Sequence, residues 1–306
     1  MTPFLPSLFR RTLPALTLAV AGLVAQAQST PLAYRVKGPN GSATLLGSIH
    51  LGKKSFYPLP AAVEKAWKAS DALAVEADAS DTAAVAALAP KMILMPPDNL
   101  GKALGPETWA KVESRLQHPT FKTAFKKTGV PDMAVPMFKP WALGMTLAAI
   151  PAAELGLTPE QGVDHQFLQR AKEAQRPIVE LESLAGQLDL MASMPEDVQR
   201  QSLLEGLDGI ISGEATKEFS ALITSWEKGD EQGLLKVGEA GAKSPGTRAF
   251  MRKLVDDRNV GMAEGIDKQM KTGKRVFVVV GALHLPGPKG VAELLRKKGY
   301  TVTRLK

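Results

Sequence analysis

Two histidines occupy the same local setting near opposite ends of the chain. His50 closes the run Gly47-Ser-Ile-His50 and His284 closes Gly281-Ala-Leu-His284, each after a stretch of apolar residues. Only four histidines occur in 306 residues, so the repeated setting favours function over packing. A neutral imidazole can bind a metal ion or accept a proton from water. The two glycines would let the backbone approach a ligand closely.

Glu76 adds a carboxylate to these imidazoles. It ends the run Ala72-Leu-Ala-Val-Glu76, and we expect a strand over residues 72–78 that puts Glu76 and Asp78 on one side. His50, Glu76 and His284 are the ligand types of a divalent ion such as zinc, manganese, cobalt or iron. Such an ion would lower the pKa of its bound water toward neutrality. Without a metal, a histidine paired with Glu76 could itself act as general base.

Arg258 is a further catalytic candidate, and Asp78, Glu182, Asp164 and His165 are secondary candidates. Glu182 follows an apolar run that predicts a central strand over residues 176–182. Asp164 and His165 lie at the start of a predicted helix, where His165 could face a cleft. Arg258 could stabilise an oxyanion or clamp a carboxylate, and an ion pair with Asp256 or Asp257 is an equal alternative. His118, beside Pro119 in a polar stretch, should be solvated.

The elements that must position these side chains predict an α/β fold. The stretch Val276-Phe-Val-Val-Val280 suits a strand buried on both faces. Residues 33–37 and 43–49 flank a Pro and Asn-Gly turn and predict a hairpin, while residues 301–305 form a closing strand. Residues 136–157 are apolar enough for a buried helix or the wall of a cleft. We therefore expect a single mixed sheet with the N- and C-terminal strands together, a helical insertion over about residues 79–175 and a second helical region over about 184–272.

The first 27 residues have the layout of a secretory signal peptide. Arg10 and Arg11 precede an apolar run that ends in Ala25-Gln-Ala27, a typical cleavage signal. We therefore expect a mature domain over residues 28–306 that is periplasmic or secreted. Later segments are too short for a transmembrane helix. The chain has no cysteine, which excludes disulfides, a thiolate nucleophile and a cysteine lipid anchor. Without Arg10 and Arg11 the net charge falls from +7 to +5, which does not indicate a nucleic-acid partner.

Other catalytic signatures are absent from the sequence. It contains no His-Glu-x-x-His, no Gly-x-Ser-x-Gly and no phosphate-binding Gly-x-x-x-x-Gly-Lys-Ser/Thr. The usual zincin, serine hydrolase and nucleotide-binding classes are therefore unsupported.

The ordered set of motifs resembles the TraB/GumN family. The set consists of the two Gly-x-x-His motifs, Val75-Glu-Ala-Asp78, Lys139-Pro-Trp141, Gly162-Val-Asp164, Leu181-Glu-Ser183 and Arg258-Asn259. That family includes the Tiki-type metalloproteases and is similar in fold to erythromycin-esterase and ChaN-like proteins. The resemblance implies a mixed-sheet α/β domain whose presumed active site is His50, Glu76 and His284, assisted by Arg258.

Three functions remain open from the sequence. The first is a metal-dependent hydrolase, with a peptide or another small molecule as substrate and Glu76 as ligand or general base. The second is a metal-free hydrolase of the esterase type. The third is a protein that binds a peptide, haem or metal ion without turnover. Oligomeric state and substrate have no signature in the sequence.

Overall fold

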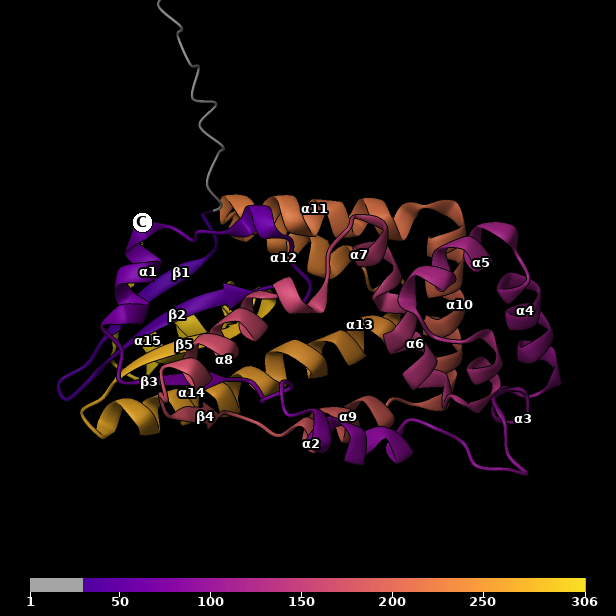
Figure 1. The fold of residues 1–306 in the computed structure, drawn as a ribbon, viewed down its shortest axis with the longest axis horizontal. Coiled ribbons are helices and arrows are strands. Elements are labelled where there is room, and N and C mark those ends of the chain that lie inside the picture. The colour runs from indigo at the N-terminus through magenta and orange to yellow at the C-terminus, as the bar shows by residue number, and fades with distance from the viewer. Residues whose placement is uncertain (1–29, 306) are drawn as a thin grey trace, which may run out of the picture.

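The computed structural model describes residues 30–305, and the predicted signal peptide lies outside this range. Within it, six strands form one sheet in the order β4-β3-β5-β2-β1-β6. The mixed α/β fold and the pairing of terminal strands in one sheet are confirmed (Figure 1). The strands are β1 (Ala33–Lys37), β2 (Ser42–Ser48), β3 (Ala72–Val75), β4 (Ile178–Glu180), β5 (Arg275–Gly281) and β6 (Thr301–Arg304).

Strand β5 is the middle of the parallel part of the sheet. It pairs in parallel with β2 on one side and β3 on the other, and β4 pairs in parallel with β3. Residues Val276 to Val280 are all buried, as their unbroken apolar run predicts. Strand β1 instead joins β2 as an antiparallel hairpin, and β6 pairs antiparallel with β1.

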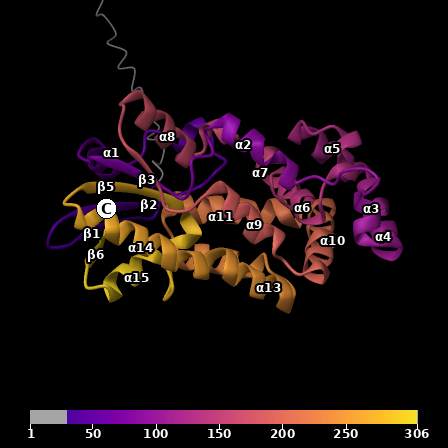
Figure 2. The ribbon, with the colours of Figure 1, turned by 90° about the horizontal axis from the view of Figure 1, so that it is seen from below.

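Helices cover both faces of the sheet. Helices α1 and α8 lie on one face, and α14 and α15 lie on the other (Figure 2). The helices are α1 (Ala61–Lys68), α2 (Thr82–Leu88), α3 (Leu100–Leu104), α4 (Pro106–Leu116), α5 (Pro119–Phe125), α6 (Pro140–Ala148), α7 (Ile150–Glu154), α8 (Val163–Glu173), α9 (Leu184–Ala192), α10 (Glu196–Ser212), α11 (Glu214–Lys228), α12 (Glu231–Ala240), α13 (Pro245–Arg252), α14 (Arg258–Lys271) and α15 (Val291–Lys297).

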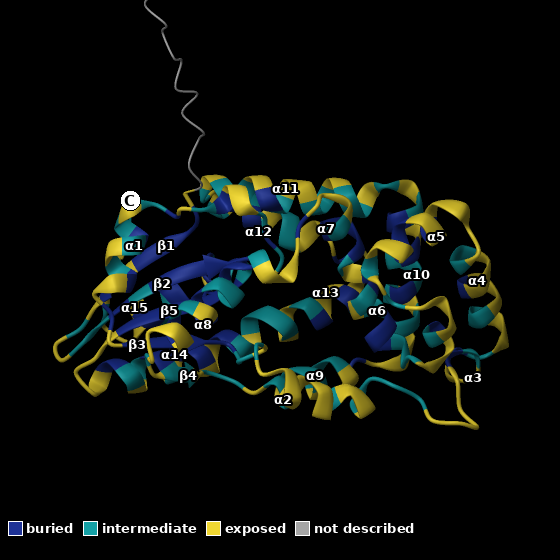
Figure 3. Ribbon diagram, viewed as in Figure 1, coloured by how far each residue is buried: buried dark blue, intermediate teal, exposed yellow. Residues whose placement is uncertain are grey.

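A second hydrophobic core lies away from the sheet, among helices α3 to α7 and α10. Leu143 and Leu147 of α6 are buried in it, so the apolar segment 136–157 packs as core. The same helix presents Met145 to a cavity, so this segment is also the wall of a cleft. Figure 3 shows the contrast between the dark, buried strands and the partly exposed helices α2 and α9.

Two sequence predictions about strands are wrong. Strand β3 ends at Val75, so Glu76 and Asp78 lie beyond the strand instead of on one of its faces. Strand β4 is at the edge of the sheet, not at its centre. Ile178 and Val179 are only partly buried and Glu180 is exposed, as an edge position allows.

Within residues 30–305, no helix has the length and apolar character needed to cross a membrane.

Candidate active site

The candidate residues follow three neighbouring parallel strands that end at the same edge of the sheet. Glu76 directly follows β3, and His50 lies two residues beyond β2. Gly281 ends β5, and His284 closes the single 3₁₀ turn η7 (Ala282–His284) that comes next. The carboxyl ends of parallel strands are where open α/β sheets place their ligand sites.

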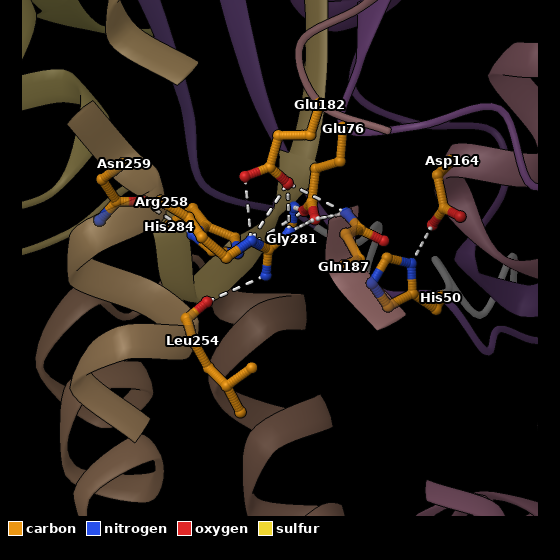
Figure 4. Close-up of polar contacts among 10 residues, drawn as sticks. All are labelled: His50, Glu76, Asp164, Glu182, Gln187, Leu254, Arg258, Asn259, Gly281 and His284. Atoms are coloured by element: carbon orange, nitrogen blue, oxygen red, sulfur yellow. Dashed lines mark hydrogen bonds and ion pairs between the residues drawn. The ribbon is translucent and has the colours of Figure 1, made fainter. Parts of the chain in front are cut away.

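The Glu76 carboxylate is held from three directions (Figure 4). The backbone N–H of Gly281 donates to Oε1 at 2.7 Å. Arg258 donates from Nη2 to Oε2 at 2.5 Å, and the Gln187 amide donates to the same oxygen at 3.3 Å. These donors fix both carboxylate oxygens, so Glu76 is a rigid group within the site.

Arg258 joins Glu76 to a second carboxylate. Its Nη2 donates to Glu182 at 2.6 Å and its Nε at 3.1 Å, while Nη1 donates to the Leu254 carbonyl at 2.9 Å. Leu254 belongs to a π-helical turn, η6 (Lys253–Asp257), and such wide turns recur at functional sites. The alternative ion pair of Arg258 with Asp256 or Asp257 is not formed, because its guanidinium pairs with Glu76 and Glu182 instead, while Asp256 contacts Lys289 at 3.1 Å.

The hydrogen bonds around His284 define which of its ring nitrogens carries the proton. Asn259 donates from Nδ2 to the Lys289 carbonyl at 3.0 Å, so its Oδ1 is the atom that faces Nδ1 of His284 at 2.7 Å. Because Oδ1 can only accept, Nδ1 carries the proton in the neutral ring. The lone pair of Nε2 is therefore available on the opposite side.

That lone pair faces the carboxylate of Glu76. Nε2 of His284 lies 3.7 Å from Oε1, and both side chains are almost fully buried. Two acceptors that face each other at this distance can share a cation or a water that donates to both. The arrangement is suited to holding a reactive water.

Burial and charge set the protonation of this pair. Burial raises the pKa of Glu76, but positive charges outweigh it and hold that pKa at about 2: those of His284 and His50, whose rings are protonated in that acidic range, and that of Arg258. Burial lowers the pKa of His284, and this outweighs the opposing charge of Glu76. His284 is thus neutral near pH 7, and Arg258 is the permanent cation that keeps Glu76 ionised.

His50 lies at the same pocket in a different environment. Its side chain is 67% exposed, and its Nδ1 is 3.1 Å from Oδ1 of Asp164 at the start of α8. The charge of Asp164 raises the pKa of His50 above its ordinary value. This Asp164 oxygen is buried, and no hydrogen-bond donor among residues 30–305 is aligned on it. As in His284, Nδ1 faces an oxygen and Nε2 points elsewhere.

A cavity of about 390 Å³ opens onto these groups. Its polar end is formed by His50, Glu76, Gln187 and Arg258, and the rest of its lining is apolar. The volume is within the range of about 300–1,000 Å³ that small-molecule sites occupy.

Two secondary candidates lie outside the network. Asp78 accepts hydrogen bonds from Ser80 and contacts Lys172 at 3.2 Å, so it stabilises a turn. His165 follows Asp164 on α8 and has no polar contact with Glu76 or His284 among the described residues. His118 is exposed, and its Nδ1 accepts a hydrogen bond from the Thr120 N–H at the start of α5.

Sequence reasoning missed Gln187 and the orienting role of Asn259. A signal for Gln187 is present, since Ser183 begins α9 immediately after Glu182 and one further turn brings Gln187 back toward that carboxylate. Asn259 follows Arg258 directly, but the contact with His284 depends on how α14 packs against the sheet.

The donor types suit a divalent metal ion. Two ligands of one ion at about 2.1 Å lie about 3.5 Å apart, close to the 3.7 Å between His284 and Glu76. An imidazole with Nδ1 bound to an oxygen and Nε2 free is the usual form of a metal-ligating histidine. However, no three donors among residues 30–305 converge closely enough to form a complete metal site. Two of the three expected donors are in place, and His50 stands apart.

Comparisons with known proteins identify the family of this chain. The profile of the TraB/PrgY/gumN family matches residues 32–304. The chain belongs to this family.

Its relatives include the YbaP proteins of Shigella flexneri and Escherichia coli, described as uncharacterized, each 28% identical. The matches cover 84% and 82% of this chain and 89% and 87% of theirs. An uncharacterized protein of Treponema pallidum is 22% identical over 87% of this chain and 80% of its own. No solved structure matches.

Proposed function

We propose that this member of the TraB/PrgY/gumN family is a metal-dependent hydrolase that acts on peptide bonds. The observation that supports the proposal is the pair of buried acceptors, His284 Nε2 and Glu76 Oε1, which lie 3.7 Å apart. The imidazole is oriented by the hydrogen bond that its Nδ1–H donates to Asn259, and the carboxylate oxygen by the one it accepts from the Gly281 N–H. A structural ion pair would need neither the fixed tautomer of His284 nor a cavity at the same place.

His284 and Glu76 are the first two ligands in this proposal, and His50 is the third through Nε2. The bound ion, whether zinc, manganese, cobalt or iron, would supply a water of lowered pKa and polarise the scissile carbonyl. His284 as a neutral imidazole and Glu76 as an ionised carboxylate have the protonation states that bind metal, whereas His50, whose pKa is raised by Asp164, would release a proton on binding. Glu76 is a weak base because its pKa is about 2, which favours metal-assisted over metal-free hydrolysis.

The remaining groups position the substrate and stabilise charge. Arg258 is largely neutralised by Glu76 and Glu182, so its main role is to hold Glu76 ionised and oriented. Gln187 directs its amide nitrogen to both carboxylates, so its amide oxygen is turned away from them (Figure 4). The residue also lines the cavity. That oxygen can accept an N–H from a substrate.

The test uses the chain without residues 1–27, with bound metal measured by elemental analysis and cleavage by fluorogenic peptides. The variants His284→Ala and Glu76→Gln should each lose metal and activity. His118→Ala, an exposed histidine far from the pocket, is the matched control and should change neither.

Each alternative predicts a different result. Activity that survives exhaustive chelation supports a metal-free esterase-type hydrolase and contradicts metal dependence. Tight binding of peptide, haem or metal that persists in Glu76→Gln, without product, supports a binding protein. Unchanged metal content and cleavage in both site variants would remove the proposal altogether.

We also propose that this activity is located in the periplasm or outside the cell, because residues 1–27 have the layout of a secretory signal peptide. Fractionation of cells that express the whole chain tests this, with the processed form expected outside the cytoplasm.

A further inference from the structure

The helices beside the active-site cavity have apolar surfaces that they do not bury. Helix α2 consists of Thr, Ala, Val and Leu, and α9 is apolar except for Gly186, Gln187 and Asp189, yet neither contains a buried residue. Figure 3 shows both in the colours of partial exposure. An exposed apolar surface next to a polar site marks a binding surface.

These helices supply most of the cavity wall. Val85 and Leu88 come from α2, and Leu184, Leu188 and Met191 come from α9. Helix backbones satisfy their own N–H and C=O groups, so this wall offers apolar contacts without hydrogen-bond partners. A stretch of peptide backbone buried there would lose its hydrogen bonds to water without replacement. A single apolar side chain buried there would lose no hydrogen bonds.

The polar end of the cavity supplies the hydrogen-bond partners that the apolar wall lacks. Gln187 gives its nitrogen to the two glutamates, which leaves its amide oxygen to accept an N–H. A peptide bond carries that N–H, whereas an ester does not. The arrangement therefore favours an amide substrate with a large apolar side chain next to the bond that is cut.

Methionines make the end of the cavity adjustable. Met145, Met191 and Leu254 line this cavity and also a neighbouring one of about 250 Å³, so they form the partition between the two. Methionine is unbranched and adapts to groups of different shape. Rotation of these side chains would open the second cavity to a longer group.

We propose that the cavity is a specificity pocket for one large apolar residue that flanks the scissile peptide bond, with Met145 and Met191 setting the length it accepts. This inference rests on the proposed peptidase function, since it names the substrate of the same site.

The first experiment maps cleavage sites by mass spectrometry in a defined mixture of peptides. Bonds next to Leu, Met or Phe should be cut at least about tenfold faster than those next to Gly, Asp or Lys, because each methylene in such a pocket contributes about tenfold or more. Equal cleavage at apolar and polar residues would overturn the inference and leave the hydrolase proposal standing. A matched ester that is cut as fast as the amide would overturn the role of Gln187.

Substitutions in the partition give the second test. Met191→Trp and Met145→Trp should fill the pocket and raise KM about tenfold for Phe or Leu substrates, and raise it much less for Ala substrates. Met191→Ala should extend the preference to side chains longer than Met. Met133→Trp is the control, because Met133 is 84% exposed and lies outside the cavity. An unchanged length preference in all three pocket variants contradicts the inference.

A third measurement does not depend on catalysis. In protein labelled with ¹³C at the methionine methyl groups, N-acetylnorleucine amide should shift the signals of Met92, Met145 and Met191 but not Met133, and N-acetylalanine amide should shift them far less. Such shifts in a protein that cleaves no peptide would contradict the proposed function and support the pocket. No difference between the two amides would overturn the pocket.

Discussion

The two Gly-x-x-His motifs have the same spacing and the same place at a strand end, but their histidines differ in environment. His284 is 7% exposed and faces Glu76, while His50 is 67% exposed and faces Asp164. The strand and glycine place an imidazole at the edge of the sheet in both cases. The helix packed against it then decides its charge: α14 brings an amide to His284, and α8 brings a carboxylate to His50. Repetition in sequence therefore does not make the two residues equivalent.

Replacing each histidine by alanine should separate the two motifs most clearly. His284→Ala should lower kcat/KM by about 100 to 10,000-fold, because it removes one member of the buried pair. His50→Ala should cost less than about 100-fold, since its side chain is mostly in solvent. Steady-state kinetics on fluorogenic peptides measure both. Equal losses would show that exposure does not reduce the contribution of His50 and would contradict the comparison.

The partners of the histidines provide the next test. Asn259→Leu leaves Nδ1 of His284 and the Lys289 carbonyl without partners, which should cost about 1–3 kcal/mol in the free energy of unfolding. Asp164→Asn should cost less than about 1 kcal/mol, because its contact is with an exposed histidine. Urea unfolding measures both variants. A larger cost at Asp164 would reverse the comparison.

Replacing each motif glycine by alanine should affect a different property of the protein. A Cβ at Gly281 would lie 3.2 Å from Oε1 of Glu76 and 3.4 Å from His284, so Gly281→Ala should lower activity about tenfold with little loss of stability. A Cβ at Gly47 would lie 3.1 Å from the Ala282 backbone, so Gly47→Ala should destabilise the fold by about 1–3 kcal/mol. Thermal unfolding beside kinetics distinguishes them. The same profile for both would argue that the motifs are packed alike.

The smallest expected effect is a shift in the pH profile. Burial lowers the pKa of His284, so kcat/KM should stay constant down to about pH 6.5 and fall only below it. Asn259→Asp adds a negative charge beside the ring, which raises this pKa and should move the acid limb to higher pH. A limb that stays in place would mean that another group controls it.

Stability should follow the same direction. The lowered pKa of His284 leaves the free energy of unfolding at its full value above the unfolded-state pKa of about 6.5. Below that pH the free energy of unfolding falls, because the unfolded state binds the proton more readily than the folded state. Glu76 contributes above its unfolded pKa of about 4.5, and this is lost as the pH falls toward 2. Urea midpoints measured from pH 7 to pH 3 should therefore decline, and less so in Glu76→Gln.

Much of the sheet could be predicted from the sequence, because its signals are local. The apolar run at Val276 and the hairpin turn near Asn40 specify their strands without reference to the rest of the chain. Glu76 could be proposed because it follows a strand. The partner of Arg258 could not, since Asp256 and Asp257 are adjacent in sequence while Glu76 is 182 residues away. The apolar wall of the cavity could not be predicted either. Helices α2 and α9 have the composition of core helices, and only the tertiary packing leaves them exposed.

The place of β5 in the sheet also determines when the candidate site can assemble during synthesis. This strand separates β2 from β3, yet about nine-tenths of the polypeptide must leave the ribosome before it is complete. Until then β3 lacks its neighbour, and contacts between segments so distant along the chain form slowly. The nascent chain therefore exposes unpaired strand edges for most of its translation, a period in which chaperones would protect it from aggregation. The candidate site, to which β5 contributes Gly281, is also incomplete until this last segment has folded.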